Sequence, residues 1–119
     1  MTEELIAIAD IPGITGLCLH KGEELLHHNF PATMGRATAM DLCHAVAGTL
    51  SAYAEASRPI SQSYFQYPEG GVLVLRTGSA EGTSEREFYL TFLISDPSAI
   101  AEVLAPARAF LTRQTRAAA

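Results

Sequence analysis

The fold of this chain is decided by the stretch ITGLCLHKGEELLHHNF at residues 14–30. Apolar residues occupy both alternating faces of residues 14–20, which predicts a strand that is covered on both sides. Lys21-Gly22 predicts a tight turn, because glycine adopts positive φ without steric cost, and residues 23–30 return as a second strand. The stretch therefore predicts a β-hairpin. It also holds Cys18 and three histidines, a combination typical of metal sites.

The geometry of this hairpin argues against a metal site built from it alone. With a two-residue turn, His20 pairs with Glu23. His27 and His28 are neighbours and point to opposite faces, so only one of them shares a face with Cys18 and His20. That one lies about 13 Å along the strand from the partner of His20, whereas zinc needs its ligands about 2 Å from one point. We therefore predict no metal ligand and no cofactor, and ordinary solvated or hydrogen-bonded histidines.

The two cysteines, Cys18 and Cys43, are too few for a disulfide framework and form no CxxC motif. Both have apolar neighbours in the sequence, which predicts reduced residues in the core. A metal site that combines the hairpin with Cys43, His44 or a second subunit remains an alternative. A small-ligand or metal-binding domain that uses the histidine-rich hairpin is therefore the alternative function.

Composition limits the classes of function. The 119 residues are 48% hydrophobic, and they fit one domain, 1–119, with a core of its own. The net charge is −5 and Lys21 is the one lysine, so the sequence offers no basic patch for nucleic acid and disfavours an anionic membrane. The acidic N-terminus does not resemble a signal peptide, and no apolar run reaches about 18 residues. We expect a cytoplasmic protein.

Helices are predicted in three places. Thr2 can cap a short helix over residues 2–10. A long helix covers residues 35–57 and has one apolar stripe, formed by Ala39, Cys43, Val46, Leu50 and Tyr53. A last helix follows Asp96-Pro97, and Pro106 should kink or divide it.

Three more strands are predicted, at residues 60–68, 72–77 and 86–94. The first has the polar composition of a sheet edge, and the last is apolar on both faces, as a central strand is. The element order is α-β-β-α-β-β-β-α, and hairpins join the strands within each run. We therefore predict an α+β fold with a five-stranded antiparallel sheet and helices on both faces.

No catalytic motif accompanies this pattern. The sequence lacks a GxSxG elbow, an HExxH motif and a phosphate-binding GxxxxGK[ST] loop. The stretch GSAEGTSE at residues 78–85 contains no lysine and joins two strands, so it predicts a hairpin loop and not a phosphate cradle. We predict no catalytic residue and no enzymatic activity.

Three stretches together resemble the Roadblock/dynein light chain superfamily. They are ELIAIADIPGITGLCLHKGEELLHHN at residues 4–29, GGVLVLR at 70–76 and DPSAIAEVLAPAR at 96–108. The resemblance spans residues 4–110 and implies a profilin-like fold in a bacterial member of the superfamily. Members have no known enzymatic chemistry of their own, and many bind small Ras-like GTPases or act as scaffolds in signalling assemblies. The resemblance thus implies a regulatory interaction domain.

The resemblance also implies a dimer, formed through the long middle helix and the adjoining edge strand so that the two sheets become one. Small residues on that helix would allow close helix contact, and an open strand edge invites pairing with a second chain. We predict a homodimer, with a small GTPase or another signalling protein as a further partner. The predicted interface residues are His44, Ala47, Gly48, Ser51, Gln62, Tyr64 and Gln66.

Overall fold

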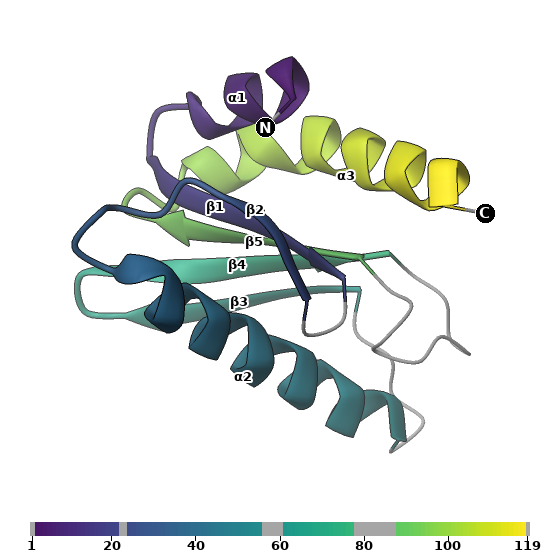
Figure 1. Ribbon diagram of the computed structural model, residues 1–119. Helices are drawn as coiled ribbons and strands as arrows, with labels where there is room; N and C mark the ends of the chain where they lie inside the picture. The colour runs from purple at the N-terminus through teal and green to yellow at the C-terminus, as the bar shows by residue number, and fades with distance from the viewer. Residues whose placement is uncertain (1, 22–23, 56–60, 78–87, 119) are drawn as a thin grey trace.

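The structure is a computed structural model, and it describes residues 2–21, 24–55, 61–77 and 88–118. Its element order is the predicted α-β-β-α-β-β-β-α (Figure 1). The elements are α1 (Glu3–Ala9), β1 (Ile14–Lys21), β2 (Glu24–His28), α2 (Gly35–Glu55), β3 (Gln62–Tyr67), β4 (Gly70–Arg76), β5 (Phe88–Ile94) and α3 (Ala99–Ala118). The predicted loop over residues 78–85 lies outside the described ranges. None of the described helices is long and apolar enough to span a lipid bilayer.

The five strands form one antiparallel sheet in the order β2-β1-β5-β4-β3. The predicted central strand, β5, lies in the middle, and every one of its seven residues is buried. The predicted edge strand, β3, lies at one edge, and β2 lies at the other. The α+β class and the arrangement of the sheet are therefore confirmed.

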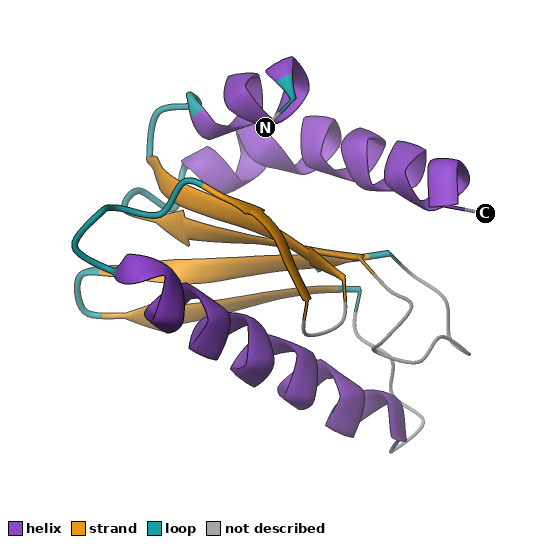
Figure 2. Ribbon diagram, viewed as in Figure 1, coloured by secondary structure: helices purple, strands orange, loops and turns teal. Residues whose placement is uncertain are grey.

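Helices cover both faces of the sheet, as predicted (Figures 1 and 2). α1 and α3 lie together on one face, over a core that includes Leu17, Leu19, Leu90 and Phe92. α2 crosses the other face. Two smaller clusters hold it there, one around Cys18 and Cys43 and one around Val46, Leu50 and Val74. Because β1 alternates strictly, Leu17 and Leu19 face α3 while Cys18 faces α2.

The pairing of β1 with β2 differs from the predicted one. His20 pairs with Leu25 rather than with Glu23, because β1 continues through Lys21 and the turn falls later in the chain. The register shifts once more between Leu19 and His20, at an irregularity of the bulge type. The residues of the turn itself lie outside the described ranges. The predicted hairpin is present, but its register, on which the argument against a metal site rested, was wrong.

Two details of the helices also differ from the sequence-based expectation. Pro106 does not divide the last helix, which is one element, α3. Its apolar side, with Val103, Ala107 and Phe110 fully buried, packs along the sheet, and that burial offsets the backbone hydrogen bond that proline removes. On α2, Tyr53 does not continue the buried stripe and is 49% exposed.

The start of the chain is held to the start of α3 by a turn that needs glycine. Thr2 caps α1 as predicted, since its hydroxyl accepts from the backbone N–H of Leu5 at 3.3 Å. After α1, Gly13 has a φ of +96°, which side chains rarely adopt. A Cβ atom at Gly13 would lie 2.8 Å from the Cβ of Ala99, so the turn and the first residue of α3 fit together closely.

Candidate functional site

The outer edge of β3 carries backbone groups that no described strand pairs with. The N–H of Arg76 donates to the carbonyl of Ser61, and hydrogen-bonded pairs alternate along an antiparallel ladder. The backbone groups that bond to β4 therefore belong to the odd-numbered residues of β3. Those that point to the open edge belong to Gln62, Tyr64 and Gln66. Such a row of donors and acceptors is a template for another strand.

Beside this edge, on the α2 face, lies an open apolar groove. It has a volume of about 220 Å³, and its lining residues come from α2, β3 and β4: Leu42, Ala45, Val46, Thr49, Phe65 and Val72. Phe65 is 44% exposed, and Tyr67 on the same side of β3 is 41% exposed. Large apolar side chains in this state of exposure, next to an unpaired strand, are typical of a protein-binding surface.

The predicted interface residues of α2 lie away from this groove, with one exception. Ala47 is only 2% exposed and packs in the cluster beneath the helix, against the sheet. His44 is exposed, but it lies two positions from Leu42, about 200° around the helix. Ser51 is half-buried on the same flank as His44. Gly48 is exposed and only about 60° around the helix from Ala45, so it adjoins the groove.

The predicted interface residues of β3 sit at the free edge through their backbones. The side chain of Tyr64 packs against the core beneath α3, on the face opposite the groove. The side chain of Gln62 lies on that face too, 3.5 Å from a guanidinium nitrogen of Arg108. Gln66 is exposed. These residues therefore offer backbone groups to a partner strand, while their side chains lie on the other face from Phe65.

The interface predicted from the sequence takes the alternate residues Gln62, Tyr64 and Gln66 of β3 and therefore does not include the groove residue Phe65. Tyr64 and Phe65 are neighbours, so they point to opposite faces, and the sequence does not show which face carries α2. The signal available in the sequence was the pair Phe65 and Tyr67, two aromatic residues at strand spacing in an otherwise polar segment.

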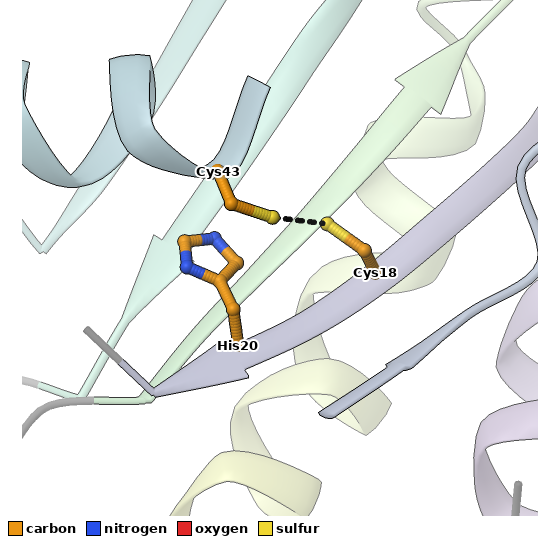
Figure 3. A group of neighbouring side chains, drawn as sticks. All are labelled: Cys18, His20 and Cys43. Atoms are coloured by element: carbon orange, nitrogen blue, oxygen red, sulfur yellow. Dashed lines mark hydrogen bonds between the residues drawn. The ribbon is translucent and has the colours of Figure 1, made fainter. Parts of the chain in front are cut away.

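A second candidate site lies in the core, where Cys18, His20 and Cys43 meet (Figure 3). One ligand atom from each of the three residues lies within 4.8 Å of the other two. The two Sγ atoms are 3.6 Å apart, and all three side chains are fully buried. Cys18 and His20 are two residues apart on β1 and so share its α2 face, while Cys43 reaches down from α2.

The ring of His20 is held in place by contacts with β5. It stacks on the ring of Tyr89, with the centroids 4.8 Å apart and the planes 7° from parallel. Its Nε2 atom lies 3.3 Å from the hydroxyl oxygen of Thr91. Both contacts come from residues at or near its cross-strand partner, since His20 pairs with Tyr89 in the sheet. The imidazole therefore has a fixed orientation beside the two sulfurs.

The two thiols influence each other's ionisation. The hydrogen bond between Cys18 and Cys43, together with burial, raises the pKa of Cys18 well above its ordinary value. The same hydrogen bond lowers the pKa of Cys43. The two thiols therefore titrate as a coupled pair, and after the first proton is lost the second is shared between the two sulfurs. The prediction that both cysteines lie in the core is confirmed.

The side chains of Cys18, His20 and Cys43 come together in a way that the sequence could not show. Cys43 was part of the alternative that the sequence left open, but its meeting with the hairpin depends on where α2 crosses the sheet. His27, by contrast, is exposed on β2. His28 is half-buried and lies directly across from Cys18 in the ladder.

Comparisons with known proteins bear on the fold. No family model matches the sequence, and no curated protein matches it. Among solved structures, the chain is similar to MglB with a tetrameric arrangement, with a TM-score of 0.71 and 15% identity over 96% of this chain and 84% of that one. It is also similar to a Roadblock/LC7 domain from Streptomyces avermitilis, with a TM-score of 0.59 and 14% identity over 88% of this chain and 91% of that one. The resemblance predicted from the sequence is thus confirmed at the level of structure, and the chain has the Roadblock/LC7 fold.

Proposed function

We propose that this chain is a non-enzymatic interaction domain that forms a homodimer and binds a small Ras-like GTPase, or another signalling protein, as a regulator or scaffold. The observation that carries the proposal is the open edge of β3 beside the apolar groove on the α2 face. The likeness to a Roadblock/LC7 domain and to an MglB with a tetrameric arrangement supports self-association as the use of that surface.

A second copy of the chain is the occupant that fits this surface best. Two copies of β3 can pair antiparallel about a dyad near Tyr64, because its outward N–H and carbonyl lie midway between those of Gln62 and Gln66. The dyad is perpendicular to the joined sheet, so both copies of α2 lie on the same face. The apolar groove of each copy, which Phe65 helps to line, is then covered at the junction.

Neighbouring residues of α2 provide a matched test of this surface. Ala45 lines the groove and His44 lies on the other flank of the helix, and both are exposed, so an arginine at either position leaves the fold intact. Ala45→Arg places a charge in the apolar junction and should weaken dimerisation at least about tenfold. His44→Arg should leave the dimer unchanged. Equal effects of the two substitutions would mean that the groove is not the contact.

The GTPase part of the proposal needs its own experiment. The dimeric chain is immobilised, and purified Ras-like GTPases of the same organism are passed over it, loaded either with GDP or with a non-hydrolysable GTP analogue. A regulator binds one nucleotide state more tightly than the other, because it couples to the conformation that the γ-phosphate sets. We expect at least about a fivefold difference in affinity between the two states. If none of the GTPases tested binds in either nucleotide state, the GTPase part of the proposal is wrong. The proposed homodimer is not affected by that result.

A further inference from the structure

We propose that Cys18, His20 and Cys43 form a binding site for one zinc ion, which joins α2 to the sheet. This inference is independent of the proposed function, because the cluster lies in the core and not at the edge of β3 (Figure 3). The sequence predicts no zinc site within the hairpin alone, because its histidines are spread along β2. In the structure the third ligand comes from the helix above, as Cys43 of α2.

The distances fit tetrahedral zinc. Two thiolates at about 2.3 Å from a tetrahedral ion lie about 3.8 Å from each other, and the Sγ atoms of Cys18 and Cys43 are 3.6 Å apart. The nitrogen of His20 lies within 4.8 Å of both sulfurs. Small rotations of the side chains therefore bring all three atoms to ligand distance, with no movement of the backbone elements that carry them.

The chemistry of the donors selects the metal. Two thiolates and an imidazole are the ligands of structural zinc, whereas magnesium and calcium prefer oxygen. Two thiolates also balance the charge of Zn²⁺. The neutral complex suits a pocket whose other walls are apolar, among them Leu25, Phe30, Ala39 and Leu93. A buried pair of thiolates without a cation would be costly in the same place.

His20 already has the support that zinc ligands require. A ligating histidine is usually oriented by a second contact, which fixes its ring and its tautomer. Here the stacked ring of Tyr89 holds the plane of the imidazole.

His28 is the residue that the structure assigns to the fourth position. It pairs directly with Cys18 across the ladder, so their side chains share the α2 face. Its Nδ1 atom is buried and has no hydrogen-bond partner among the described residues. A buried nitrogen of this kind is expensive to leave unsatisfied. Its nitrogen lies outside the cluster of three ligand atoms, so the fourth position requires a rotation of the ring toward Cys18. His27 pairs with Leu19 and faces the other way.

The experiment uses the whole chain, reduced and stripped of metal by a chelator. Zinc uptake is counted by elemental analysis after dialysis, and Co²⁺ serves as a spectroscopic probe, because thiolate ligands give sulfur-to-cobalt charge-transfer bands. We expect one ion per chain, charge-transfer bands with Co²⁺, and bleaching of those bands by zinc. Cys18→Ala and Cys43→Ala should each lower the affinity at least about 100-fold.

The adjacent histidines provide the matched control. His28→Ala should weaken binding at least about tenfold, and His27→Ala should leave it unchanged. Circular dichroism of each metal-free variant shows whether that variant folds. If a cysteine variant does not fold, the cobalt bands of the unaltered chain still report whether thiolates bind the ion. The proposal is overturned if the folded, reduced chain takes up no zinc, if Co²⁺ binds without charge-transfer bands, or if binding survives both cysteine substitutions. Equal affinities of the two histidine variants would overturn the assignment of His28.

Discussion

The Sγ atoms of Cys18 and Cys43 lie 3.6 Å apart in the core, although the two residues are 25 positions apart in the chain. One stands on β1 and the other on α2, so their contact fixes where the long helix crosses the sheet. The same helix forms one wall of the apolar groove beside β3. The position of the buried pair and the shape of the exposed surface are therefore linked through α2.

Burial predicts that both thiols are protected from alkylation in the folded, reduced and metal-free chain. Neither side chain is exposed, so a reagent such as iodoacetamide has to wait for local or global opening. We expect native labelling to be at least about 100-fold slower than labelling in denaturant, as followed by mass spectrometry. Fast labelling of either cysteine under native conditions would show that α2 does not cover β1 as described.

Arg108 is predicted to be important for the strand that carries the free edge. It reaches from α3 and donates to the carbonyl of Arg76 at 2.9 Å and to that of Ser61 at 2.7 Å, which ties the end of β4 to the start of β3. Arg108→Ala should lower the free energy of unfolding by about 1–3 kcal/mol, because it leaves two carbonyls without these donors. Urea denaturation measures the change.

The control for that substitution is Arg113→Ala on the same helix. Arg113 forms an ion pair with Glu4 at the surface, where both side chains are well exposed. Exposed ion pairs contribute little, so its loss should change the free energy of unfolding by less than about 1 kcal/mol. If the two variants are destabilised equally, the contacts of Arg108 with β3 and β4 are not what holds the edge strand.

Gly48 and Gly70 are predicted to respond in opposite directions to the same substitution. No atom lies within 4 Å of a Cβ at Gly48, in the middle of α2, so Gly48→Ala should raise the free energy of unfolding by about 0.5–1 kcal/mol. A Cβ at Gly70 would collide with the backbone carbonyl of Ile94, so Gly70→Ala should lower it by about 1–3 kcal/mol. A loss of stability in Gly48→Ala, measured by denaturation of the monomeric chain, would contradict the first expectation.

The regular elements could be predicted from the sequence because their signals are local. The hydrophobic spacing of Ala39, Cys43, Val46 and Leu50 defines the buried side of α2, and the all-apolar run in β5 marks the central strand. Thr2 as a cap is another local feature. Each of these depends on residues a few positions apart, and the structure confirms them.

The features that could not be predicted depend on contacts between distant segments. The register of His20 depends on where the turn falls and on the irregularity beside Leu19, and neither follows from composition. Which face of β3 lies beside α2 depends on the handedness of the whole sheet, so Tyr64 was preferred to Phe65. The meeting of Cys43 with Cys18 likewise required the path of α2 over the sheet, and this is why the sequence left it open.

The proposed dimer depends on the open edge of β3 as the place where a second copy binds, and the molar mass of two variants at one position of that edge shows whether it does. The N–H of Gln66 points to the edge, so Gln66→Pro removes a donor from the partner strand without taking a hydrogen bond from β4, whereas Gln66→Ala keeps the donor. Size-exclusion chromatography with light scattering at micromolar concentration should give about twice the 12.7 kDa of one chain for the natural sequence and for Gln66→Ala. It should give a single chain for Gln66→Pro. If the natural sequence is a monomer, or if Gln66→Pro is still a dimer, the open edge of β3 is not where two copies bind.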